Sequence, residues 1–198
     1  MRFSYAELSR EYLELWRAMR IAAGRLATID RIIAKILAGR PAYAAVEAAT
    51  SVPWPVVATF HNLEAGLDFT AHLHNGDPLT GRTVQVPKGR PVAGSPPFAW
   101  QASAIDALTF KGLAANRNWT VQGTAYALES YNGWGYRRYH PEVKSPYLWG
   151  FSSHYAGGKY ARDGRWDQAL VSGQCGGMVL LKRLQEKGLA VLAEDAIA

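Results

Sequence analysis

Residues 54–69 read WPVVATFHNLEAGLDF. Pro53 and Pro55 are tolerated only in the first turn of a helix, so the apolar residues that follow predict a helix that runs to Glu64. Gly66 is expected to end this helix, because glycine readily adopts the left-handed conformation found after a helix. The sequence therefore predicts a carboxylate at the C-terminal end of a mainly apolar helix.

This position gives Glu64 unusual electrostatics. The negative end of the helix dipole and the apolar neighbours both disfavour a carboxylate anion, so we expect a raised pKa for Glu64. A carboxylic acid that stays protonated near neutral pH is what protonation of a glycosidic oxygen requires. The alternative interpretation is an ordinary exposed glutamate at a helix end. His61 lies one turn earlier on the same face and is predicted to be a hydrogen-bonded groove residue that contacts substrate.

Helical periodicity continues on both sides of this segment. Apolar residues recur every three or four positions, which is typical of amphipathic helices. The predicted helices are 5–20, 26–37, 41–49, 99–113, 120–131 and 172–187, with Thr120 and Ser172 as N-caps of the last two.

Two segments lack this periodicity. Residues 68–98 are rich in Gly and Pro, which predicts a loop-rich lobe with at most a small hairpin near residues 83–86. Residues 132–168 are rich in aromatic residues and glycine, and we expect an ordered loop region there. The predicted fold class is mainly α (α+β), a helical domain with a small irregular β or loop lobe. The predicted boundaries are 1–40 for an N-terminal helical extension, 41–188 for the domain and 189–198 for a tail.

Composition and charge exclude several classes of protein. Hydrophobic residues make up 48% of the 198 residues and charged residues 19%, which excludes intrinsic disorder. The apolar runs are shorter than the ~18 residues of a membrane span, so no stable membrane insertion is expected. Glu7, Glu11 and Glu14 interrupt the N-terminal segment, so we expect no secretory signal and synthesis in the cytoplasm. The net charge of +6 favours anionic partners. The basic residues are dispersed along the chain, however, which argues against a nucleic acid as the partner.

Two features invite a metal or a nucleophile interpretation. His72 and His74 alternate as on one face of a strand, but two ligands do not make a metal site, so no metal and no cofactor are predicted. His74 is instead expected to organise its loop or to contact substrate. Cys175 is the only cysteine and lies near the start of the last predicted helix. It is interpreted as a core residue, because nothing ties a histidine to it.

Aromatic residues concentrate between positions 131 and 160. Aromatic rings stack against the C–H faces of pyranose rings, while side chains such as Asn132 bind hydroxyl and acetamido groups. For most of these aromatic residues the alternative is a core beneath a long loop. The residues predicted to line a sugar-binding cleft are Tyr131, Asn132, Trp134 and Tyr136.

The order of helix, glutamate, irregular lobe and further helices resembles the lysozyme superfamily. The resemblance is to a group of phage and bacterial lysozyme-like proteins. It extends from Pro53 to Leu184, which is about two-thirds of the chain, and four segments carry it. They are VPWPVVATFHNLEAGLDF, HLHNGDPLTGRTVQVPKGRP, YALESYNGWGYRRYHP and SPYLWGFSSHYAGGKY. The first 45 residues fall outside it.

The resemblance implies an activity and a set of site residues. Glu64 falls on the catalytic acid of the superfamily, and Tyr131-Asn132 is similar to the Tyr-Asn motif of goose-type lysozymes and lytic transglycosylases, whose tyrosine faces the scissile sugar. The implied activity is a peptidoglycan-cleaving glycosidase that cuts the β-1,4 bond between N-acetylmuramic acid and N-acetylglucosamine. The implied partner is the peptidoglycan glycan strand, reached after release from the cell or as part of a phage particle.

Hydrolysis requires a second group. An inverting enzyme places a base about 6.5–9.5 Å from the acid, and a retaining enzyme places a nucleophile at about 5–5.5 Å. Asp77 is the first candidate, because its separation from Glu64 is similar to that in goose-type lysozymes; the alternative is a turn aspartate that accepts backbone N–H bonds. Asp68 is nearer to Glu64 in sequence but follows it by only one turn, and the alternative role for it is to cap or orient its loop. Glu129 is a rival acid, or else an ion-pair partner or an orienting group.

Three other functions stay open. Without a second carboxylate, the same scaffold acts as a lytic transglycosylase, in which the sugar's own hydroxyl attacks to give an anhydro product. A non-catalytic wall-binding or phage structural module would keep the groove and lose turnover. A chitinase-like or chitosanase-like specificity is the third. In each case, the two N-terminal helices are candidates for docking or homodimerisation.

Overall fold

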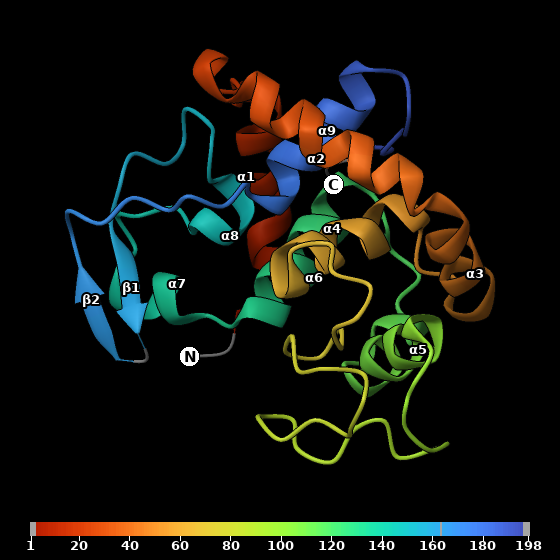
Figure 1. Cartoon of the computed structure of the whole chain (residues 1–198). Coiled ribbons are helices and arrows are strands. Elements are labelled where there is room, and N and C mark those ends of the chain that lie inside the picture. Colours follow the sequence, from red (N-terminus) through yellow and green to blue (C-terminus); the bar gives the residue numbers. More distant parts are fainter. Residues whose placement is uncertain (1–2, 163, 196–198) are drawn as a thin grey trace. The chain divides into compact units, whose positions relative to one another are not determined.

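The computed structural model of the chain describes residues 3–162 and 164–195 (Figure 1). They fall into two compact units, one with the residues up to 31 and from 118 onward, the other with residues 32–117. The helices are α1 (Tyr5–Ala18), α2 (Leu26–Ala38), α3 (Arg40–Thr50), α4 (Trp54–Ala65), α5 (Trp100–Phe110), α6 (Val121–Asn132), α7 (Gly135–Tyr139), α8 (Pro146–Trp149) and α9 (Gly177–Glu186), with 3-10 turns η1 (Ala23–Arg25) and η2 (Leu113–Ala115). Strands β1 (Lys159–Arg162) and β2 (Arg165–Asp167) pair in the one small sheet of the described residues. The predicted mainly α class is confirmed.

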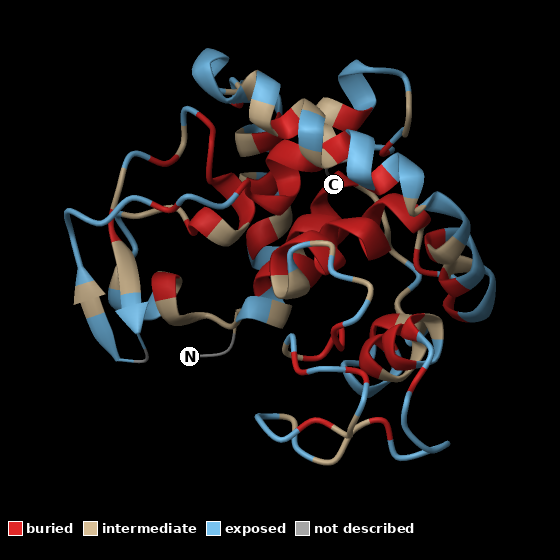
Figure 2. Cartoon of the chain, in the orientation of Figure 1, coloured by how far each residue is buried: buried red, intermediate tan, exposed pale blue. Residues whose placement is uncertain are grey.

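Helix α4 is the centre of the unit that comprises residues 32–117. All of its residues from Trp54 to Leu63 are buried (Figure 2), and α3 packs against both α4 and α5. Pro55 lies in the first turn, and Gly66 follows the last turn with a φ of 59°. Both ends of this helix therefore agree with the prediction from the sequence.

The other unit is built around α1 and α6, which lie side by side (Figure 1). Tyr12, Leu13 and Trp16 on the inner face of α1 are buried, so this apolar face packs within the unit. The side chain of Thr120 accepts a hydrogen bond from the backbone N–H of Gly123, which confirms the predicted N-cap of α6. Helix α8 contacts both α6 and α9.

The last helix begins later than the sequence predicts. Its N-cap is Gly176 and not Ser172. A Cβ atom at Gly176 would lie 2.4 Å from the carbonyl carbon of Leu148, so the segment before α9 is pressed against the backbone at the end of α8. The hydroxyl of Ser172 instead accepts a hydrogen bond from the N–H of Gln174, which forms a local turn.

The hairpin also lies elsewhere. Residues 83–86 form no strand, whereas β1 and β2 pair antiparallel within the segment expected to be loop. Across this hairpin Lys159 faces Asp167, Tyr160 faces Trp166 and Arg162 faces Arg165, with an irregularity between positions 160 and 162. The short helices α7 and α8 lie in the same segment. Among the helices of the described residues, none is both long and apolar enough to cross a membrane.

Candidate functional site

Glu64 lies in the last turn of α4 and is half-buried. The loop that follows the helix turns back on it, because a Cβ atom at Gly76 would lie 3.5 Å from the backbone oxygen of Glu64. Gly76 has a φ of 81°, a conformation that glycine adopts without strain. The carboxylate predicted to be the acid is thus attached to a rigid, buried helix, and the residue before Asp77 packs against its end.

Asp77 closes the loop and organises the next one. Its backbone oxygen accepts from the N–H of His72 at 2.7 Å. Its Oδ2 accepts from the backbone N–H groups of Val84 at 2.8 Å and Gln85 at 3.0 Å, and from the Asn75 side chain at 3.0 Å. The hydrogen bond from Gln85, followed by that from Val84, lowers the pKa of Asp77. This is the geometry of the turn aspartate, the alternative to a catalytic base.

His61 is a core residue, which corrects the expectation that it contacts substrate in a groove. It has no exposed surface. The centroid of its ring lies 4.5 Å from the ring centroid of Trp100 and 4.7 Å from that of Phe69. The hydroxyl of Tyr43 donates to Nδ1 at 2.9 Å, and Nε2 donates to the backbone oxygen of Asp68 at 3.1 Å. Burial lowers the pKa of His61 to about 4, so the ring is neutral.

His74 is also buried. Its contacts support the predicted role as an organiser of its loop, whereas its burial argues against the predicted contact with substrate. Its Nε2 donates to Oδ2 of Asp106 at 2.8 Å, and the side chain is 1% exposed. Arg90 binds both oxygens of Asp106, at 2.8 and 2.7 Å. These three side chains tie two parts of the loop-rich segment to α5.

His72 is held in the interior by hydrogen bonds at both ring nitrogens. It is fully buried, with Nδ1 2.7 Å from the hydroxyl of Ser103 and Nε2 2.8 Å from the backbone oxygen of Gly81. Across residues 3–162 and 164–195, no group of three His, Cys, Asp or Glu side chains could hold a metal ion.

The two other carboxylates have structural partners. Oδ1 of Asp68 accepts from the N–H and the hydroxyl of Thr70, at 2.8 and 2.6 Å, which caps the loop as predicted. Glu129 is 4% exposed, and its Oε2 accepts from Tyr12 at 2.5 Å and from Arg137 at 2.9 Å. Burial raises the pKa of Glu129, and the ion pair with Arg137 opposes that shift. The ion-pair interpretation of Glu129 therefore matches the geometry.

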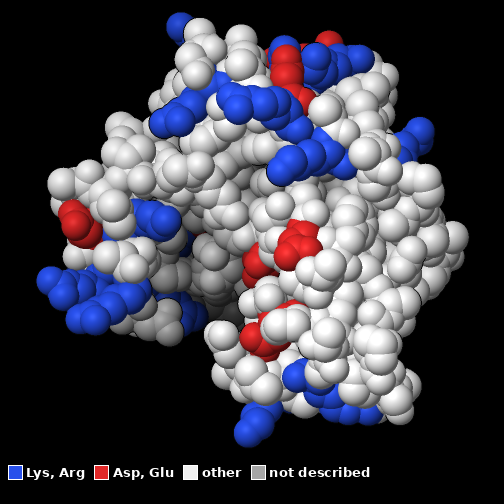
Figure 3. All heavy atoms as spheres, viewed as in Figure 1, with Lys and Arg blue, Asp and Glu red and all other residues white. Residues whose placement is uncertain are grey.

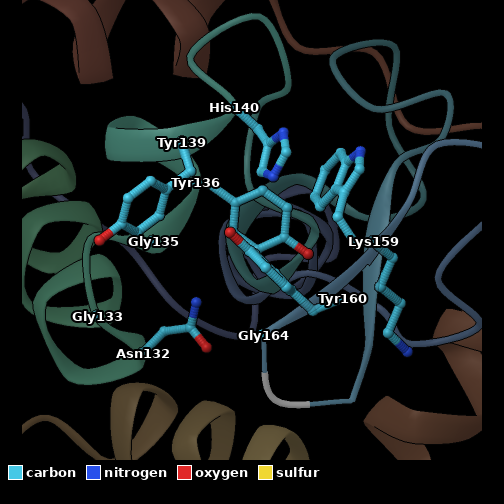
Figure 4. A pocket seen from close by; sticks show the side chains of 10 residues that line it. Asn132, Gly133, Gly135, Tyr136, Tyr139, His140, Lys159, Tyr160 and Gly164 are labelled. Atoms are coloured by element: carbon cyan, nitrogen blue, oxygen red, sulfur yellow. The ribbon is translucent and has the colours of Figure 1, made fainter.

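An open pocket of about 800 Å³ lies beside α7 and the β1–β2 hairpin (Figure 4). Its lining combines aromatic rings from both elements with Asn132 at the end of α6 and Lys159 on β1; the rings are Tyr136, Tyr139, His140, Tyr160 and Trp166. His140 stacks on Trp166 with a centroid separation of 3.5 Å and an angle of 9°. Burial raises the pKa of Tyr136 to about 12, so its hydroxyl remains a hydrogen-bond donor.

The pocket brings together two of the four residues predicted to line a sugar-binding cleft. Asn132 and Tyr136 line it, whereas the ring of Trp134 packs on Phe3 and Tyr126, with centroids 5.2 and 5.4 Å away. Tyr131 is half-buried in the last turn of α6 and does not line this pocket.

Of the five rings in the pocket, the sequence predicted only Tyr136 to line the cleft; the others are Tyr139, His140, Tyr160 and Trp166. Tyr160 and Trp166 are a cross-strand pair with centroids 5.2 Å apart. The signal that predicts such a pair is the Asp-Gly dipeptide at 163–164, which is a frequent hairpin turn.

Cys175 is 1% exposed, and burial raises the pKa of its thiol to about 12. This agrees with the core interpretation, since a nucleophilic cysteine needs an accessible thiolate.

Comparison of the chain with protein-family models, with curated proteins and with solved structures finds no match.

Proposed function

We propose that this protein is a peptidoglycan-cleaving glycosidase that cuts the β-1,4 bond between N-acetylmuramic acid and N-acetylglucosamine. The aromatic pocket beside α7 is the observation that carries the proposal. The half-buried rings of Tyr160 and Trp166 offer faces for the apolar side of a pyranose ring, and the exposed amide of Asn132 can bind an acetamido or hydroxyl group.

Glu64 is the proposed general acid. Protonation of a glycosidic oxygen requires a carboxyl group held in one position, because a misplaced proton donor loses much of its effect. Helix α4 supplies this rigidity, since its ten residues from Trp54 to Leu63 are all buried. The resemblance of the sequence to lysozyme-like proteins implies the same role for Glu64. Tyr131 and Asn132 are proposed to orient the sugar near the scissile bond.

The hydrogen bonds of Asp77 favour a second candidate, a lytic transglycosylase. A hydrolase needs a base or nucleophile beside the acid. Asp77 already accepts two backbone N–H bonds and one side-chain bond, all through Oδ2, and its pKa is lowered. A lower pKa weakens a base. If no other carboxylate replaces it, the sugar's own hydroxyl attacks, and the product is lighter by one water than the hydrolysis product.

The proposal is tested by incubating purified insoluble peptidoglycan with the protein. We expect a loss of turbidity and release of soluble disaccharide peptides, and mass spectrometry then separates hydrolysis from transglycosylation. Trp166→Ala removes one stacking face, so we expect a higher Kd for a glycan oligomer and slower clearing at low peptidoglycan concentration. The proposal is refuted if the wild-type protein binds peptidoglycan but releases no glycan fragment, which is the behaviour of a non-catalytic wall-binding module.

A further inference from the structure

Residues 83–90, which we name the valine loop, lie between α4 and α5 and are closed by one buried threonine, Thr83. The backbone N–H of Thr83 donates to the backbone oxygen of Arg90 at 2.8 Å, and the N–H of Gly89 donates to the backbone oxygen of Thr83 at 2.8 Å. The hydroxyl of Thr83 accepts from the N–H of Arg90 at 2.9 Å and donates to the backbone oxygen of Pro87. These hydrogen bonds give the loop a defined shape.

The valine loop presents apolar side chains to solvent. Val84 is 71% exposed and Val86 is 88% exposed, and Val92, just beyond the loop, is 66% exposed. The carboxylate of Asp77 accepts the N–H groups of Val84 and Gln85, at 2.8 and 3.0 Å, and so fixes the backbone that carries the exposed valines. Apolar surface in water is unfavourable, and a concentration of it on a folded protein marks an interaction site.

The charge around the valine loop is positive. Between Asp77 and Asp106 the sequence contains Arg82, Lys88 and Arg90 and no acidic residue. Arg90 is neutralised by its ion pair with Asp106, so Arg82 and the exposed Lys88 supply the charge. In Figure 3 the outer end of the loops between α4 and α5, at the bottom of the view, shows basic side chains and no acidic ones.

From this combination we infer that the valine loop binds the surface of an anionic lipid bilayer. Val84 and Val86 enter the boundary between headgroups and acyl chains, while Lys88 and Arg82 contact the anionic headgroups. Apolar burial and electrostatic attraction both contribute to such interfacial binding. The contact is reversible adsorption and involves no membrane-spanning segment. It is independent of the proposed function, because it uses none of the residues proposed to bind or cleave the glycan.

Two properties of the loop favour a lipid surface over a dissolved polyanion. A polyanion binds through the cations and gains nothing from valines that stay in water. A bilayer boundary is poor in water, so backbone groups that enter it need internal acceptors. The N–H groups of the loop that donate within its own unit are those of Thr83, Val84, Gln85, Gly89 and Arg90, and a proline such as Pro87 has no N–H.

A fluorescent reporter on the loop tests the contact directly. Val86→Cys is labelled with nitrobenzoxadiazole maleimide, whose emission brightens and shifts to shorter wavelength when it leaves water. Cys175 does not compete for the label, because it is 1% exposed. We expect this response with vesicles of phosphatidylcholine and phosphatidylglycerol, and little response with phosphatidylcholine alone. Val191→Cys is the matched control, since Val191 is 87% exposed in the segment after α9, and its label should not respond.

Substitutions separate the apolar contribution from the charge. Val86→Asn is expected to weaken co-sedimentation with the anionic vesicles about tenfold, whereas Val191→Asn should have no effect. Lys88→Gln is expected to weaken it about fivefold. Lys35→Gln, at an exposed lysine on α2, changes the net charge equally and should change binding little. A wild-type circular dichroism spectrum shows that each variant is folded.

Three outcomes overturn the inference. The first is that the wild-type protein does not bind the anionic vesicles, and the second is that it binds while the label at position 86 stays in water. The third is wild-type binding by Val86→Asn together with loss of binding in Lys88→Gln, which indicates a site for a dissolved polyanion. Each of them leaves the proposed function intact, because glycan release from peptidoglycan is measured without lipid.

Discussion

Replacement of Asp77 separates the two interpretations of this residue. Asp77→Ala removes the acceptor of two backbone N–H groups and one side-chain amide, at 2.8–3.0 Å. A hydrogen bond to a charged group contributes about 1.5–3 kcal/mol. The two backbone bonds therefore give about 3–6 kcal/mol if the loop stays rigid. Because the loop can relax toward water, we expect a loss of about 2–4 kcal/mol in the free energy of unfolding. Asp77→Asn keeps an acceptor oxygen and is expected to lose about half as much.

Hydrogen exchange measures this effect at the bonds themselves. In Asp77→Ala the amides of Val84 and Gln85 are expected to exchange at least about thirtyfold faster, which corresponds to about 2 kcal/mol. Asp77→Asn should also keep peptidoglycan cleavage within about tenfold of wild type, whereas loss of a catalytic base costs about 10²–10⁴. Unchanged exchange at both amides in Asp77→Ala, or a thousandfold loss of cleavage in a folded Asp77→Asn, would refute the structural interpretation.

Three further predictions concern the rest of the chain. Gly176→Ala is expected to lower stability by about 1–3 kcal/mol, because its Cβ would lie 2.4 Å from backbone atoms, whereas Gly173→Ala meets no atom within 4 Å and should change little; urea denaturation checks both. Arg137→Met removes the ion-pair partner of the buried Glu129 and should cost about 3 kcal/mol, more than Arg138→Met at its exposed neighbour, and equal losses would contradict this. The pKa of His61 is about 4 in the folded protein and 6.5 in its ordinary state, so its contribution of about 3 kcal/mol is complete above pH 6.5 and is lost as the pH falls toward 4. Tm should accordingly fall less between pH 7 and pH 4.5 in His61→Gln, and an identical fall would show that His61 is not responsible.

Local signals in the sequence predict helix α4 well. Prolines at its start, an apolar run and Gly66 at its end each act within one or two turns, so no distant contact is needed to predict its bounds. The same holds for the Thr120 cap of α6. The start of α9 depends instead on the close approach of Gly176 to Leu148, and no pattern near residue 172 indicates it.

The residues of the candidate site also differ in whether local sequence predicts their positions. The position of Glu64 at a helix end follows from the sequence, but the burial of His61 follows from Tyr43, Phe69 and Trp100, which lie elsewhere in the chain. A histidine one turn before a glutamate has the same pattern whether it faces a groove or the core. Trp166, in contrast, joins the aromatic pocket by pairing with Tyr160, six residues earlier, so a local turn signal was sufficient to predict it.

The central claim is that Glu64 donates the proton that cleaves the glycan. It is tested most directly by the initial rate of soluble glycan release from purified peptidoglycan, measured by mass spectrometry, for wild type, Glu64→Gln and Glu47→Gln. Glu47 is the matched control, because it is also a half-buried glutamate and lies on α3, which packs against α4. We predict that Glu64→Gln, with a wild-type circular dichroism spectrum, is at least about a hundredfold slower, while Glu47→Gln cleaves at the wild-type rate. Cleavage by folded Glu64→Gln at the wild-type rate would contradict the account.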